Sequence, residues 1–171
     1  MIVRVLAVGL LLVTGALLQT ALFPLVTIGG FRPDLLLLVT VAVALRDGPL
    51  SGLRVGFAAG LLTDLLVSQS PVGLAALVFT VVGLAVGLAR PYLALESLTA
   101  PLIVAFLSGL LGTAGYGLLS LLLGEDRMTP TLLVQGSVAV ALYNTLLAPA
   151  VLALVRPLSH HFPLSGPGTL D

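Results

Sequence analysis

The chain has no cysteine, no tryptophan and no lysine, so all seven of its basic side chains are arginines. The missing cysteines exclude disulfides, thiol nucleophiles and zinc–thiolate sites. Charge of either sign is also scarce, because charged residues make up 8% of the 171 residues, against about 25% in an average soluble domain. The formal net charge is zero and no basic run occurs, which argues against a nucleic-acid partner.

Apolar residues are abundant. They form 58% of the sequence, and the mean hydropathy is +1.22. So few polar groups could not cover a soluble core of this size, and the composition therefore predicts an integral membrane protein. Arg4 precedes an apolar run, as in a signal peptide, but no Ala-x-Ala cleavage site follows before Gln19 and Pro24. We interpret residues 5–23 as a retained first helix.

The apolar runs and the turn residues between them predict six membrane-spanning helices, because one span needs about 20 apolar residues. The predicted ranges are 5–23, 35–45, 50–67, 72–89, 98–123 and 131–155. The second range is short, and a re-entrant element over residues 32–66 would change the count. The predicted fold is an all-α polytopic bundle, with a single domain over residues 1–156 and a flexible tail over residues 157–171.

Six spans would place both termini on one side of the membrane. Five of the seven arginines fall on that side, so the positive-inside rule predicts that both termini are cytoplasmic. The two remaining arginines, Arg32 and Arg127, lie beside acidic residues on the other side.

Charge is concentrated in residues 32–66, which hold six of the 14 charged residues. They are Arg32, Asp34, Arg46, Asp47, Arg54 and Asp64. If the second and third ranges form an antiparallel hairpin, a rise of about 1.5 Å per residue brings Arg32, Asp34 and Asp64 to a similar depth. An aspartate within a span is costly unless it faces protein, so we predict that Asp64 pairs with Arg32. A ligand or proton site and a partner contact are the alternatives for Asp64.

Glycines recur at four-residue spacing in two of the predicted helices. They are Gly52, Gly56 and Gly60 in the third range and Gly83 and Gly87 in the fourth. Small residues at this spacing let helices pack closely in a membrane, which makes these glycines candidates for helix packing or for a partner interface. In the second case, leucine at position 56 or 60 would abolish partner association without preventing insertion.

Isolated polar residues carry weaker signals. Gln19, Gln135 and Asn144 lie in or near spans, and we predict that they form hydrogen bonds between helices. No catalytic, cofactor-binding or metal-binding pattern occurs, because there is no H-E-x-x-H, no G-x-S-x-G and no P-loop lysine. His160 and His161 have no further ligands beside them. We therefore predict that the chain is not an enzyme and has no cofactor.

Three consecutive motifs carry a resemblance to a known family. They are Pro33-Asp34-Leu35-Leu36-Leu37, Ala44-Leu45-Arg46-Asp47-Gly48-Pro49 and Gly52-x-x-x-Gly56-Phe57-x-x-Gly60-Leu61-x-x-Asp64-Leu65. Together they resemble the MreD family of bacterial rod-shape-determining membrane proteins, and Gln19 and Pro24 upstream also fit. After Pro71 and Gly73 the match lies mainly in length and helix count.

The resemblance implies a non-enzymatic scaffold or regulatory subunit of the cell-elongation complex in the bacterial inner membrane. It implies binding to MreC, a link to cytoskeletal MreB and to the RodA-type polymerase with its penicillin-binding transpeptidase, and contact with membrane lipid. The family is also similar in fold to the S-components of energy-coupling-factor transporters. That similarity supplies the alternative function, a small-molecule-binding transporter subunit with its ligand near Asp34 and Asp64. A membrane enzyme is a third hypothesis, for which the chain lacks a paired acid and base.

Overall fold

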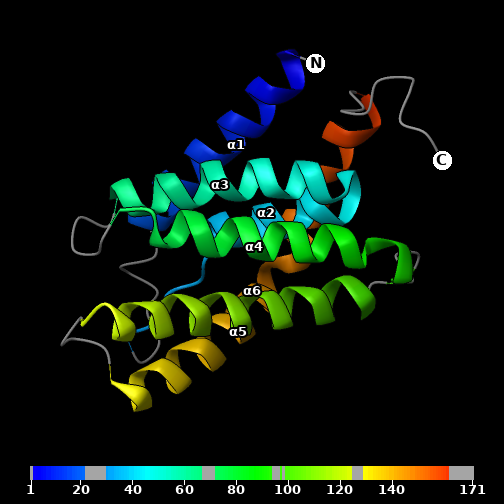
Figure 1. Ribbon diagram of the computed structural model, residues 1–171. Coiled ribbons are helices and arrows are strands. Elements are labelled where there is room, and N and C mark those ends of the chain that lie inside the picture. The colour runs from blue at the N-terminus through cyan, green and yellow to red at the C-terminus, as the bar shows by residue number, and fades with distance from the viewer. Residues whose placement is uncertain are drawn as a thin grey trace.

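The computed structural model describes residues 2–21, 30–66, 72–93, 97, 99–124 and 129–161. Within these ranges it forms an all-α bundle (Figure 1), as the sequence predicted. The helices are α1 (Ile2–Ala21), α2 (Leu35–Asp47), α3 (Pro49–Leu66), α4 (Leu74–Ala89), α5 (Thr99–Leu122) and α6 (Pro130–His161), with the short 3-10 helix η2 (Arg90–Tyr92) after α4. Each predicted range overlaps one of these α-helices.

The last helix is longer than predicted. It ends at His161 rather than at residue 155, so the predicted start of the tail at residue 157 falls within α6. Pro149 and Pro157 lie inside α6 without ending it. In apolar surroundings a backbone that leaves the helix finds no water to bond, so a helix continues past a proline more readily than in a soluble protein. Residues 162–171 lie outside the described residues.

Helix α2 is the core of the bundle. All residues from Leu35 to Leu45 are buried, and α2 contacts each of the other five α-helices. Its sequence is apolar on every side, which is typical of a helix surrounded by protein. With 13 residues it is about 20 Å long, whereas α5 with 24 residues is about 36 Å long. The central helix is therefore shorter than the helices that enclose it.

Successive helices alternate in direction (Figure 1), so the α2–α3 turn, the end of α4, the start of α5 and the end of α6 share one end of the bundle. Helices α3 and α4 lie side by side, and α1 crosses the bundle at a steep angle. An apolar groove of about 400 Å³ separates part of α1 from α2 and α6. Gly48, with φ of +86°, connects α2 to α3, and its N–H donates to the carbonyl oxygen of Ala44 at 3.0 Å. A positive φ favours glycine, so this turn depends on Gly48.

Within the part of the chain that the structure describes, three helices are long and apolar enough to cross a membrane, namely Leu74–Tyr92, Thr99–Leu122 and Pro130–Val155. The apolar part of α1, Val5–Ala21, is shorter. Large side chains such as Leu10, Leu111 and Leu146 are 68%, 64% and 77% exposed, which suits lipid and not water. The two remaining spans predicted from the sequence correspond to α2, which is short, and to α3, which carries the charged residues Arg54 and Asp64.

Candidate functional site

The first turn of α2 is held by α1 and α6. The N–H of Asp34 donates to Oδ1 of Asn144 at 3.0 Å, and the N–H of Leu35 donates to Oε1 of Gln19 at 3.2 Å. Asp34 caps its own helix, because its Oδ1 accepts from the N–H of Leu37 at 3.0 Å. Backbone N–H groups at a helix start have no partner within the helix, so the three side chains satisfy groups that would otherwise stay unpaired.

Two of the predicted interhelical hydrogen bonds are thereby confirmed. Asn144 is 1% exposed, and it reaches α2 from α6, while Gln19 reaches α2 from the last turns of α1. Gln135 differs from them, because its side chain is exposed on α6. Both confirmed bonds go to backbone N–H groups and not to other side chains, so they fix the position of α2 along the bundle.

Asp64 is buried, as predicted, but the prediction that it pairs with Arg32 was wrong. Its Oδ2 accepts from the N–H groups of Gly73 and Ala76 at 2.9 and 3.1 Å, and its Oδ1 accepts from the N–H of Ala75 at 3.0 Å. Asp64 therefore caps the start of α4 from the end of α3. A carboxylate at a helix N-terminus meets unpaired donors and the positive end of the helix dipole. Arg32 is exposed and takes no part in this arrangement.

The five candidate glycines all lie at the contact between α3 and α4. A Cβ atom at Gly52 would overlap the carbonyl oxygen of Gly83, and one at Gly56 would overlap the carbonyl oxygen of Phe79. A Cβ at Gly60 would overlap the carbonyl oxygen of Ala75, and one at Gly87 would overlap the backbone Cα and N atoms of Pro49. The structure therefore places these glycines in close packing within the chain. A leucine at position 56 or 60 would separate α3 from α4, so it does not test a partner interface.

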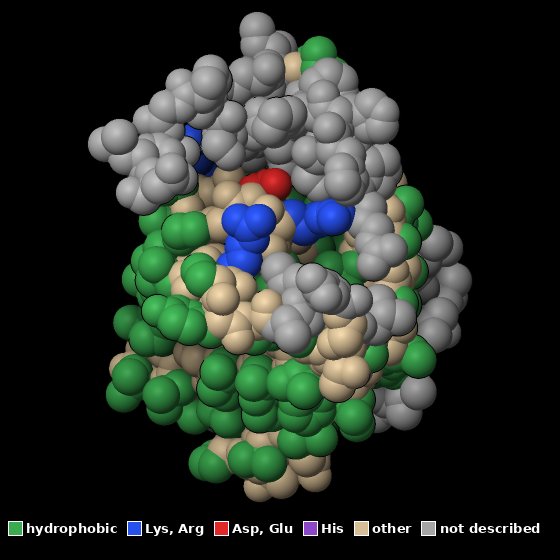
Figure 2. All heavy atoms as spheres, turned by 90° about the vertical axis from the view of Figure 1, so that its right-hand side faces the viewer, with side chains coloured by type: hydrophobic (Ala, Val, Ile, Leu, Met, Phe, Trp, Pro, Cys, Tyr) green, Lys and Arg blue, Asp and Glu red, His purple; other side chains and the backbone are tan. Residues whose placement is uncertain are grey.

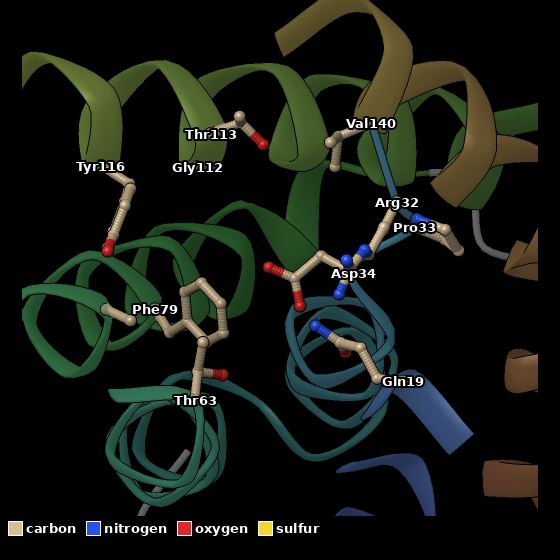
Figure 3. Close-up of a pocket in the computed structure, with 11 residues that line it drawn as sticks. Gln19, Arg32, Pro33, Asp34, Thr63, Phe79, Gly112, Thr113, Tyr116 and Val140 are labelled. Carbon is tan, nitrogen blue, oxygen red and sulfur yellow. The ribbon is translucent and has the colours of Figure 1, made fainter. Parts of the chain in front are cut away.

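A cavity of about 210 Å³ lies where α2 begins (Figure 3). It occupies the space that the short central helix leaves between its longer neighbours. Helices α1, α3, α4, α5 and α6 and the segment before α2 contribute to its lining, whose polar members are Gln19, Arg32, Asp34, Thr63, Thr113 and Tyr116. Phe79 forms an apolar wall. Such a concave site with a few converging polar groups is the usual form of a small-molecule site.

Asp34 is the acidic group of this cavity. Its carboxylate points into the open space in Figure 3. Asp34 precedes the first residue of α2, and burial raises the pKa of its carboxyl from 3.8 to about 6, although hydrogen bonds from the N–H groups of Leu37 and Leu36 act in the opposite direction. Arg32 contributes the only guanidinium to the lining among the described residues, and it is exposed.

Three charges of the hairpin, Arg46, Asp47 and Arg54, lie at the opposite end of the bundle. Arg46 and Asp47 end α2, Arg54 lies in the second turn of α3, and the guanidinium of Arg90 approaches Gly48. Figure 2 looks onto this end and shows arginine side chains beside an acidic side chain, with hydrophobic side chains covering much of the described surface below them. The structure therefore separates the hairpin charges into two groups, of which only Arg32 and Asp34 line the cavity.

Sequence reasoning missed Thr63, Thr113 and Tyr116 as lining residues. Thr113 and Tyr116 are three positions apart and share one face of α5, and a polar pair at this spacing in an apolar helix was the available signal. The sequence around Thr63 offered no such signal. In the structure its hydroxyl also donates to the carbonyl oxygen of Ala59 within its own helix. No cluster of three or more His, Asp or Glu side chains suited to a metal forms in the described part of the chain.

The helical bundle, the long apolar helices and the lipid-compatible surface define an α-helical membrane protein. The family model of the rod shape-determining protein MreD matches residues 1–158, and the chain belongs to that family. The predicted resemblance is thereby confirmed. Neither the comparison with curated proteins nor the comparison with solved structures gave a match. The expected likeness to the S-component fold therefore stays a prediction.

Proposed function

We propose that the chain is a non-enzymatic scaffold or regulatory subunit of the bacterial cell-elongation complex. Membership of the MreD family across residues 1–158 is the observation that carries this proposal. In the proposal the chain binds MreC in the cytoplasmic membrane and is thereby linked to MreB and to the RodA-type polymerase with its transpeptidase. The hydrogen bonds of the charged hairpin agree with a structural role, because Asp34 and Asp64 both cap helices.

The proposed topology has six spans and two cytoplasmic termini. It is supported by the alternating helix directions and by the grouping of Arg46, Arg54 and Arg90 near one end of the bundle. Arginines at the ends of spans favour the cytoplasmic side. The cavity beside Asp34 would then open toward the outer side.

The scaffold proposal is tested by co-expression of the tagged chain with MreC alone in a host that lacks both proteins. Purification through the tag in mild detergent is expected to recover MreC in a fixed ratio. A tagged unrelated six-span protein expressed at the same level is the control. Recovery of MreC at the level of that control would contradict direct binding.

A transporter subunit is the second candidate function, and the cavity beside Asp34 favours it. The described residues give this cavity a volume of about 210 Å³ and a lining of mixed polarity. In this case the chain would bind a soluble molecule and hand it to a multi-span coupling protein with paired ATPases. Co-purification of such a coupling protein from native membranes would support this function in place of the scaffold.

A further inference from the structure

The cavity at the start of α2 contains one group of each charge. The carboxylate of Asp34 points into the space, and Arg32 belongs to the same lining. The carboxylate of Asp34 accepts a hydrogen bond from the N–H of Leu37 at the start of α2, and the described part of the chain shows no ion pair between Asp34 and Arg32. The two opposite charges therefore face one cavity without neutralising each other directly.

The rest of the lining is suited to a small polar guest. Thr63, Thr113 and Tyr116 bring hydroxyl groups from α3 and α5, and Phe79 brings an aromatic ring from α4. The volume of about 210 Å³ exceeds by far the space of about 10–15 Å³ that one water needs. An anion alone would meet the carboxylate of Asp34, and a cation alone would meet the guanidinium of Arg32. A molecule with both charges satisfies both groups, since charge-assisted hydrogen bonds are the strong ones at a partly buried site.

We propose that this cavity binds a zwitterion in which a primary ammonium group contacts Asp34 and a phosphate or carboxylate contacts Arg32. Two sources offer this chemistry, namely a free small molecule such as an amino acid or phosphoethanolamine, and the headgroup of phosphatidylethanolamine. The proposal goes beyond the scaffold function, because it gives the chain a ligand of its own. It does not depend on the binding of MreC.

The test uses the full chain purified in a detergent free of phosphatidylethanolamine, with thermal unfolding followed by the helical circular dichroism signal. The soluble probes are glycine and phosphoethanolamine, and the lipid probe is phosphatidylethanolamine added to the micelles. Phosphocholine and phosphatidylcholine are the matched controls, because their trimethylated nitrogen cannot donate hydrogen bonds to Asp34. We expect a ligand-dependent rise in the unfolding midpoint with a primary ammonium probe and none with its trimethylated control.

Two variants assign the effect to the cavity. Asp34→Asn removes the charge but keeps the helix cap, because asparagine caps helices as well as aspartate does. Arg32→Gln removes the other charge at an exposed position, and Arg54→Gln at the opposite end is the matched control. The rise is expected to disappear in Asp34→Asn and Arg32→Gln and to persist in Arg54→Gln.

The outcomes also identify the source of the zwitterion. A rise with a soluble probe indicates a free small molecule, and a rise with the lipid probe only indicates a membrane headgroup. Equal stabilisation by the trimethylated controls would overturn the proposal, and so would a rise that survives both cavity variants. The absence of any rise with all three primary ammonium probes would overturn it as well.

Discussion

At the scale of single residues, the acidic side chains of the charged hairpin serve helix ends. Asp64 bonds three N–H groups at the start of α4, and Asp34 bonds one at the start of α2. An aspartate in so apolar a chain could be predicted to face protein, and Asp64 does. Its partners could not be predicted, because they are backbone groups that a chain reversal brings beside α3 and that no residue pattern encodes.

The cap formed by Asp64 should contribute strongly to stability. Asp64→Ala leaves three N–H groups without their acceptor, two of them buried, and we expect it to lower the free energy of unfolding by about 2–4 kcal/mol. Thermal or denaturant unfolding in detergent, followed by circular dichroism, measures the change. Thr63→Ala is the neighbouring control, because the hydroxyl of Thr63 bonds only within its own helix. A midpoint for Asp64→Ala equal to that of the control would refute this role.

The raised pKa of Asp34 predicts how the stability of the folded chain changes with pH. A carboxyl with a folded pKa of about 6 and an ordinary value of 3.8 binds its proton more tightly in the folded state. Folding is therefore favoured at low pH through this group, and the contribution is lost as the pH rises from about 4 to about 6. The difference in unfolding midpoint between the wild-type chain and Asp34→Asn should change across this window. A difference that is constant from pH 4 to pH 7 would show that the pKa is not raised.

The ionisation of Asp34 should also govern the affinity for the proposed ligand. An ammonium group pairs with the charged carboxylate, so binding of glycine, whose own two charges do not change in this range, should weaken as the pH falls below about 6. The other ionisable groups in the lining are Arg32 and Tyr116, and Asp64, which is not in the lining, accepts from the N–H of the lining residue Ala75. Arginine and tyrosine normally titrate far above this range, so they should not produce the change.

At the scale of elements, the α3–α4 pair and the central α2 decide the fold. The glycine spacing predicted close helix packing correctly, because a face of small residues reveals itself in sequence. The partner of that face could not be read from the spacing, and it proves to be α4 of the same chain. Helix α2 could be located by its apolar run, but its central position depends on contacts with all the other helices.

Substitution of one glycine on this face should separate the two helices. A Cβ at Gly56 would overlap a backbone carbonyl of α4, so Gly56→Ala is expected to destabilise the fold by about 1–3 kcal/mol. Gly9→Ala is the matched control, because no atom lies within 4 Å of a Cβ at Gly9. There the higher helix propensity of alanine should raise stability by up to about 1 kcal/mol. Unfolding midpoints that shift in the same direction for both variants would contradict close α3–α4 packing.

At the scale of the whole molecule, the proposed topology places the α2–α3 turn in the cytoplasm. The chain has no cysteine, so single cysteines report on accessibility without background. Tyr92→Cys lies at the end of η2 at a residue that is 90% exposed, and Thr131→Cys lies at the start of α6 at the opposite end. In intact spheroplasts a membrane-impermeant maleimide should label Thr131→Cys, and it should label Tyr92→Cys only after permeabilisation. The reverse pattern would invert the topology, and labelling of both from one side would exclude six spans.

If the chain acts as a scaffold of the cell-elongation complex, it should bind the other proteins of that complex in native membranes, and identifying its partners there tests this function. The tagged chain, expressed from its own locus, would be purified in mild detergent, and the co-purifying proteins would be identified by mass spectrometry. We predict that a single-span MreC-type protein co-purifies, with or without the RodA-type polymerase. Recovery of a multi-span coupling protein with paired ATPases, and no MreC, would contradict the scaffold function and establish a transporter subunit.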